Sequence, residues 1–219
     1  MSEQSSIHHA AAGLHPIDVN ALVDARHPDP FSQLGLHQTE AGPVVRAMLP
    51  NAARVSVVAR DDGRTLGELQ QLHPGGLFGG TVSEAVPYRL RIDWHGAVQE
   101  IEDTYSFGPA LGDEPLQRVA WGDPYAVLEC LGSRPIDLDG VPGVRFAVWA
   151  PNARRVSVVG DFNAWDGRRH PMRLRHQAGV WELFVPRLCA GTRYKYEILT
   201  REGYALPLKA DPCAMQTEQ

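Results

Sequence analysis

A nine-residue stretch occurs twice in this chain, about a hundred positions apart. Residues 50–58 read Pro-Asn-Ala-Ala-Arg-Val-Ser-Val-Val, and residues 151–159 read Pro-Asn-Ala-Arg-Arg-Val-Ser-Val-Val. The similarity continues upstream, where residues 29–31 (Asp-Pro-Phe) match residues 123–125 (Asp-Pro-Tyr), and downstream into the following apolar segments. A repeat this long indicates two copies of a whole domain, because the units of a solenoid are much shorter.

Both copies carry the pattern of half-buried strands. Val144, Phe146 and Val148 alternate with Arg145 and Ala147, and a period of two with β-branched and aromatic residues is typical of a strand. Many short strands separated by Gly, Pro and Asn turns predict an all-β fold of two tandem immunoglobulin-like β-sandwiches with short helical linker segments. The predicted strands are 44–49, 54–59, 77–82, 88–94 and 98–102 in the first copy, and 144–149, 155–159, 170–174, 180–185, 194–199 and 205–208 in the second.

The chain of 219 residues is long enough for two domains of common size. We expect a disordered tail over 1–15, a first sandwich over 16–107 that opens with a short helix at 17–26, and a second sandwich over 136–219. The segment 108–135 is predicted to be a linker with a short helix at 119–131.

Charge and composition narrow the class of protein. The net charge of −5 and the pI near 6.0 provide no basic field, so we expect neither nucleic acid nor a membrane surface as a partner. The start of the chain has no signal-peptide pattern, and no apolar run is long enough to span a bilayer. Three cysteines, an odd number without metal-ligand spacing, place the chain in a reducing cytoplasm, and we expect no metal site and no cofactor.

The motifs of the second copy carry a resemblance. Its segments are 144–153 (VRFAVWAPNA), 156–166 (VSVVGDFNAWD), 179–186 (GVWELFVP), 194–198 (YKYEI) and 209–212 (KADP). Together they resemble the family 48 carbohydrate-binding module that precedes the catalytic barrel in branching and debranching enzymes of the α-amylase superfamily. The duplicated front half is similar to the long form of bacterial 1,4-α-glucan (glycogen) branching enzyme.

This resemblance implies a role in glycogen biosynthesis. Branching enzymes cut an α-1,4 glucan and rejoin it as an α-1,6 branch, with two carboxyl groups held on a (β/α)₈ barrel. Such a barrel needs about 250 residues, whereas this sequence ends at Gln219. We therefore predict no catalytic residues and no activity of this polypeptide alone. The implied partners are α-1,4-glucan or glycogen, and the catalytic barrel of the same enzyme.

The chemistry of glucose selects the candidate binding residues. The faces of the sugar ring carry C–H groups that stack on an aromatic surface, and its hydroxyls need amide, carboxylate or ammonium partners. Trp165 suits the first need, and Asn163, Asp166 and Lys195 suit the second. The resemblance carries sugar contact to Trp165 and Lys195, and it places a second aromatic at Tyr204.

Structural alternatives remain open for each of these residues. Trp165 would instead pack on its own domain or on the barrel, and Asn163 and Asp166 would fix the turn through hydrogen bonds to the backbone. Trp149, on the face opposite Phe146, is a candidate for docking the catalytic domain. The competing functions are a brace for the barrel without sugar affinity and the module of a debranching enzyme. The first copy has only Ala-Arg-Asp-Asp-Gly-Arg at 59–64 in place of the Phe-Asn-x-Trp loop, and we do not expect it to bind glucan in the same way.

Overall fold

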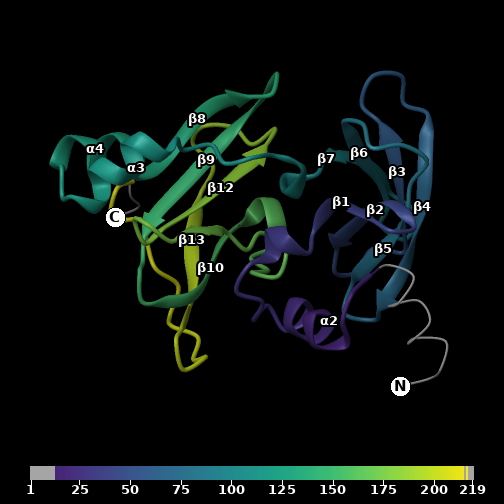
Figure 1. The fold of residues 1–219 in the computed structure, drawn as a ribbon, viewed down its shortest axis with the longest axis horizontal. Helices are drawn as coiled ribbons and strands as arrows, with labels where there is room; N and C mark the ends of the chain where they lie inside the picture. The colour runs from purple at the N-terminus through teal and green to yellow at the C-terminus, as the bar shows by residue number, and fades with distance from the viewer. Residues whose placement is uncertain (1–12, 215, 217–219) are drawn as a thin grey trace. The chain divides into compact units, whose positions relative to one another are not determined.

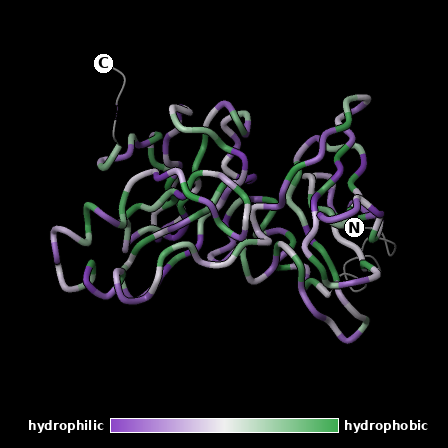
Figure 2. Tube along the Cα trace, turned by 90° about the horizontal axis from the view of Figure 1, so that it is seen from above, coloured by the Kyte–Doolittle hydropathy of each residue, from purple (hydrophilic) through white to green (hydrophobic). Residues whose placement is uncertain are grey.

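The computed structural model describes residues 13–214 and 216 (Figure 1). The chain forms two compact units, Met1–Ser106 and Phe107–Gln219. Both units are built mainly from antiparallel strands, and hydrophobic and hydrophilic residues interleave along them (Figure 2), as expected where one face of a sheet is buried. The predicted all-β fold class is confirmed.

Unit 1 is a sandwich whose two layers share one long strand. Its strands join in the order β1-β2-β5-β4-β3-β6-β7. Strand β4 pairs with β3 through its first half and with β5 through its second half. Side chains from both layers meet in a single core that includes Val45, Val57, Phe78 and Leu90. The strands are β1 (Gly35–Thr39), β2 (Gly42–Met48), β3 (Arg54–Ala59), β4 (Thr65–His73), β5 (Leu77–Thr81), β6 (Tyr88–Asp93) and β7 (Val98–Glu102).

A short helix packs on unit 1 where the sequence predicts one. Helix α2 (Pro16–Val23) begins with a proline, and the side chain of His15 caps it by accepting a hydrogen bond from the N–H of Ile17. Leu14 is buried in a cluster with Leu22. The disordered tail predicted over 1–15 is therefore wrong for Leu14 and His15. Residues 1–12 lie outside the described part of the chain.

Unit 2 packs a four-stranded sheet against a two-stranded one. The first has the order β11-β12-β9-β8, and the second pairs β10 with β13. Phe146 and Tyr194 meet edge to face between the sheets, with ring centroids 4.7 Å apart. The predicted core residues Phe146, Val148, Val156, Val158 and Trp181 are all buried. The strands are β8 (Gly132–Leu138), β9 (Val141–Trp149), β10 (Ala153–Gly160), β11 (Arg173–Arg175), β12 (Val180–Pro186) and β13 (Tyr194–Thr200).

Two helices cover the other face of the β9–β12 pair. The helical hairpin consists of α3 (Asp113–Ala120), α4 (Pro124–Cys130) and the turn between them, and it buries Leu116, Val119 and Ala126 with Ala147 and Val180. The single helix predicted over 119–131 is wrong. Gly122, at φ +81°, ends the first helix, and Asp123 with Pro124 starts the second.

Some strands differ from the prediction as well. Strands β1, β4 and β8 were not expected. Conversely, the predicted strand 205–208 is reduced to isolated bridges between Leu199 and Ala205 and between Tyr196 and Lys209.

The sequence repeat appears in the structure as a repeated set of contacts. In unit 1 the hydroxyl of Tyr88 donates a 2.5 Å hydrogen bond to buried Asp103. In unit 2 the hydroxyls of Tyr194 and Tyr196 donate to buried Asp211, at 2.5 and 3.1 Å. The strand pairing is also equivalent, since Val58 lies opposite Arg89 and Val159 lies opposite Lys195.

Candidate functional site

The Trp165 loop, residues 160–169, follows strand β10 and is held from inside by Asn163. The amide oxygen of Asn163 accepts the backbone N–H of Gly160 at 3.0 Å, and its nitrogen donates to the carbonyl of Val158 at 2.9 Å. The same nitrogen lies 2.9 Å from Nδ1 of His170. Asn163 is 1% exposed. Sugar contact by Asn163 is therefore wrong for this structure, and its role is the turn-fixing alternative.

The backbone of the loop presents Trp165 in an unusual conformation. Ala164 and Trp165 have φ values of 56° and 58°, in the left-handed region that residues with a side chain rarely adopt. The N–H of Trp165 donates to the carbonyl of Gly160 at 3.0 Å. Backbone strain of this kind persists where the surroundings enforce it, and it gathers at functional sites.

The indole of Trp165 is on the surface. It is 40% exposed, and its Nε1–H donates a 2.8 Å hydrogen bond to Oδ1 of Asp161, which is itself exposed. The structure therefore places the ring at an open position, with its polar edge directed to a carboxylate.

Lys195 lies next to this loop on the neighbouring strand. It pairs with Val159, and the next pair along the strands joins Gly160, which binds the Trp165 backbone, to Tyr194. Lys195 is exposed, and within residues 13–214 its ammonium group has no hydrogen-bond or ion-pair partner. Arg89, the equivalent residue of unit 1, instead donates to the carbonyl of Arg60 and to Glu100.

Asp166 is engaged within the loop. Its carboxylate accepts the backbone N–H of Arg168 at 3.0 Å and the guanidinium group of the same residue at 2.7 Å. Burial alone would raise the pKa of Asp166, but these hydrogen bonds outweigh burial and hold the pKa below its usual value. The contacts match the turn-fixing alternative for this residue.

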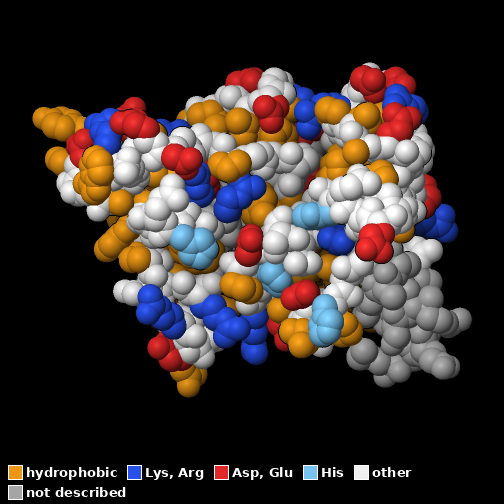
Figure 3. Space-filling model, in the orientation of Figure 1, with side chains coloured by type: hydrophobic (Ala, Val, Ile, Leu, Met, Phe, Trp, Pro, Cys, Tyr) orange, Lys and Arg blue, Asp and Glu red, His pale blue; other side chains and the backbone are white. Residues whose placement is uncertain are grey.

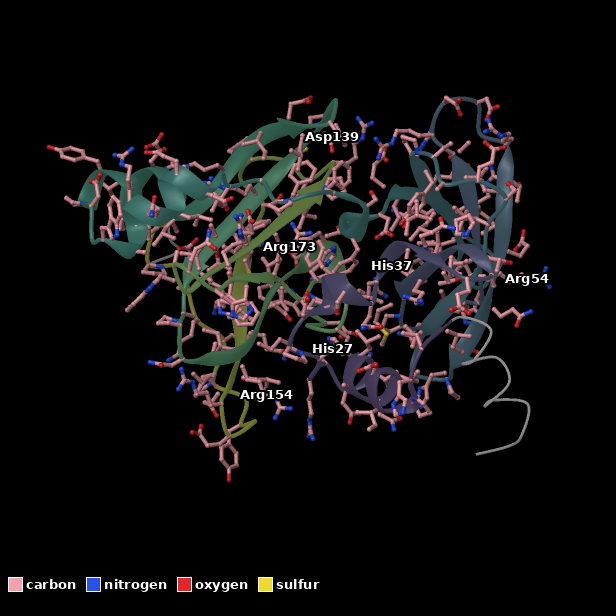
Figure 4. All side chains as sticks on the ribbon, in the orientation of Figure 1. His27, His37, Arg54, Asp139, Arg154 and Arg173 are labelled. Atoms are coloured by element: carbon pink, nitrogen blue, oxygen red, sulfur yellow. The ribbon has the colours of Figure 1, made fainter. Side chains whose placement is uncertain are left out.

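Tyr204 lies apart from the other candidates. It is 72% exposed and belongs to the turn at the end of β13, where its N–H donates to the hydroxyl of Thr200. Lys195 lies near the start of that strand, beside the Trp165 loop, and five residues separate it from Thr200, which is about 17 Å at the usual rise per residue. Arg154, labelled in Figure 4, marks the Tyr204 end of the sheet, since a Cβ added at Gly203 would lie 3.9 Å from its Nη1.

Other exposed aromatic residues occur on the opposite side of the β9 sheet. Trp149 is 60% exposed, in agreement with the strand alternation that directs it away from Phe146. The helical hairpin adds three exposed apolar side chains, and the orange groups at the left edge of Figure 3 lie over this hairpin. These residues are Trp121, Tyr125 and Leu128.

Two residues important to the Trp165 loop were missed from the sequence, Asp161 and His170. The position of Asp161 four residues before Trp165 was the available signal. Among residues 13–214 and 216, no three His, Cys, Asp or Glu side chains are grouped as metal ligands. The helices of the same described part are all too short or too polar to span a bilayer.

Comparison with known proteins covers both units. Residues 15–105 match the N-terminal domain of alpha-1,4-glucan branching enzyme, and residues 130–214 match carbohydrate-binding module 48, described as the isoamylase N-terminal domain. The 1,4-alpha-glucan branching enzyme of Paraburkholderia xenovorans is 79% identical over 98% of this chain and 29% of its own length. The enzymes of Burkholderia pseudomallei and Pseudomonas putida are 59% and 57% identical over 92% and 94% of the chain, and each is covered over 28% of its length.

The chain thus spans less than a third of the length of these relatives. The relatives carry the name of branching enzymes, which favours that family over the debranching alternative. The chain carries the two domains in tandem and corresponds to the N-terminal region of the bacterial 1,4-alpha-glucan branching enzymes.

Proposed function

We propose that unit 2 binds α-1,4-glucan at Trp165 and Lys195 and positions it for a branching enzyme of which this region forms part. The observation that carries the proposal is an exposed indole on a loop beside Lys195, whose ammonium group has no hydrogen-bond or ion-pair partner among the residues that the structure describes. The indole offers a flat apolar face to the C–H groups of a glucose ring, and the ammonium group donates to a hydroxyl. Most other cationic side chains in the loops and strands are already hydrogen-bonded within the protein, as Arg168 and Arg89 illustrate.

The catalytic step belongs to the rest of the parent enzyme. Transfer of α-1,4 segments to α-1,6 branch points requires the barrel that the family resemblance implies. We propose that the region itself is non-catalytic, that glycogen is its natural ligand, and that the parent enzyme acts in the cytoplasm. Tyr204, about 17 Å along the strand from Lys195, is a separate contact for a long glucan chain.

A specific observation also favours the brace alternative. Trp149 and the apolar residues of the helical hairpin expose large hydrophobic side chains, and exposed apolar surface is typical of protein contacts. Trp149 is the proposed docking residue for the catalytic barrel. The surface of Trp149 and the helical hairpin is separate from the Trp165 loop. Unit 2 can therefore both dock the barrel and bind glucan.

Affinity electrophoresis in gels containing glycogen tests glucan binding. We expect the wild-type chain to be retarded, Trp165→Ala to lose about tenfold in affinity, and Lys195→Ala about threefold. Trp149→Ala and Lys209→Ala are matched controls, because both positions are exposed and neither adjoins the Trp165 loop in the strand pairing. Equal mobility of the wild-type chain with and without glycogen would exclude glucan binding and leave the brace as its function.

A further inference from the structure

The side chain of Trp165 makes one hydrogen bond in the described residues, from its indole N–H to Asp161. The backbone of Trp165 is fixed by the carbonyl of Gly160, but the side chain has two further rotatable bonds. Within the described residues, the ring makes no aromatic contact, and its Nε1–H has Asp161 as its hydrogen-bond acceptor. Without that acceptor, the ring would lose the hydrogen bond that directs its polar edge toward Asp161.

Asp161 is well placed to be this acceptor. It opens the short 3₁₀ helix Asp161–Asn163, and its own carbonyl accepts the N–H of Ala164 at 3.3 Å. The carboxylate and the indole are thus anchored to the same turn, which Asn163 secures from the buried side. Asp161 forms no ion pair with a cation in the described residues. Among the described residues, the hydrogen bond from the indole of Trp165 is the polar contact that the carboxylate of Asp161 makes.

We propose that Asp161 is a positioning residue that fixes the indole of Trp165 with its face open to the ligand. A ring that is already ordered loses less conformational entropy when a sugar stacks on it. Asp161 therefore raises glucan affinity through Trp165 without contacting the sugar. This inference rests on the proposed function of the Trp165 loop, and it adds to that site a residue whose contribution is orientation.

Two variants separate orientation from charge. Asp161→Ala removes the acceptor, whereas Asp161→Asn keeps an oxygen that accepts the indole N–H but removes the charge. Asp137→Ala is the matched control, since Asp137 is an exposed aspartate of the same unit on strand β8. The full 219-residue chain is used throughout.

The first readout does not need a ligand. In ¹H–¹⁵N spectra, the signal of the Trp165 indole is identified as the one lost in Trp165→Phe. We expect that signal to shift and to exchange faster with water in Asp161→Ala, and to stay near its wild-type position in Asp161→Asn and Asp137→Ala. An unchanged indole signal in Asp161→Ala would overturn the proposal.

The second readout is affinity for maltoheptaose. We expect Asp161→Ala to bind about 3- to 10-fold more weakly than wild type, with Asp161→Asn within about twofold of it. A displaced indole signal with undiminished affinity would overturn the positioning role. Equal losses in both variants would overturn it too, since they would assign the effect to charge. Absence of binding by wild type would refute the glucan site itself, a result distinct from failure of Asp161 alone.

Discussion

Asn163 and His170 face each other at the base of the Trp165 loop, with Nδ2 of the amide 2.9 Å from Nδ1 of the imidazole. The amide oxygen is occupied by the N–H of Gly160, so the amide nitrogen donates and Nδ1 of His170 accepts. A protonated imidazole has no acceptor to offer. The anchor of the loop therefore requires neutral His170.

Acid should weaken unit 2 through this histidine. Burial, with a contribution from nearby Arg169, lowers the pKa of His170 from 6.5 to about 4. Its stabilising contribution is fully present above pH 6.5 and is lost as the pH falls toward 4, because the unfolded chain takes up the proton first. Between pH 7 and pH 5, we expect the free energy of unfolding to fall about 2 kcal/mol more in wild type than in His170→Gln. Parallel pH dependence in urea titrations of the two proteins would contradict this assignment.

Unit 1 should respond to acid in the opposite direction. Burial raises the pKa of Asp103 from 3.8 to about 6, although hydrogen bonds from Tyr88 and Tyr105 oppose the rise. The folded state binds the proton more tightly, so stability is lost as the pH rises from 3.8 through 6. From pH 7 to pH 5, we expect this group to stabilise unit 1 by about 1 kcal/mol. Asp103→Asn should abolish this gain in the stability of unit 1, which hydrogen exchange of its backbone amides measures. An unaltered gain in the variant would show that another group causes it.

Two carboxylates share Arg175 and should differ widely in importance. Buried Glu182 accepts Arg175 at 2.7 Å and also the N–H groups of Ala110 and Leu111 at 3.1 and 2.9 Å. Asp113, the second partner of Arg175, is 81% exposed at its side chain. Glu182→Ala should cost about 3 kcal/mol of unfolding free energy, because it removes the buried carboxylate partner of Arg175 and leaves the N–H groups of Ala110 and Leu111 without their acceptor. Asp113→Ala should cost less than about 1 kcal/mol. Similar losses of unfolding free energy for Glu182→Ala and Asp113→Ala in chemical denaturation would contradict the greater importance of Glu182.

Glycines at equivalent positions of the two units should be intolerant of a side chain. Gly35 and Gly132 have φ values of +91° and +89°, and a Cβ at these positions would lie 2.6 Å from the carbonyl oxygen of Tyr105 and 2.7 Å from that of Cys213. Gly140, at φ +74°, has open space around it. We expect Gly140→Ala to cost about 1 kcal/mol from backbone strain alone, and Gly132→Ala to cost at least about 2 kcal/mol. Equal losses of stability for Gly132→Ala and Gly140→Ala in thermal unfolding would contradict a steric clash at Gly132.

The sequence predicted the strands of the repeat well and missed three others, of which β1 and β8 lie at sheet edges and β4 lies inside its sheet. Strand β3 was predicted with the observed bounds because Val55, Val57 and Ala59 alternate toward one core. Strand β8 contains a proline and lies at the edge of its sheet, where packing imposes less pattern. In β4, Leu66, Leu69 and Leu72 recur every three residues, a spacing typical of a helix.

The candidate site was predictable in residue type but not in role. The Phe-Asn-x-Trp motif identified the loop, and the exposure of Trp165 and Lys195 agrees with surface positions. That Asn163 is buried follows from its three local hydrogen-bond contacts, which sequence spacing does not reveal. The separation of Tyr204 from the loop depends on the direction of β13, which only the strand pairing supplies.

Calorimetric titration of maltoheptaose into the 219-residue chain, with Trp165→Ala and Trp149→Ala beside wild type, measures whether the indole of Trp165 binds glucan. We expect saturable binding by wild type and Trp149→Ala, and about tenfold weaker binding by Trp165→Ala. Binding that survives Trp165→Ala at full strength, or no binding by any of the three proteins, would contradict this role of Trp165.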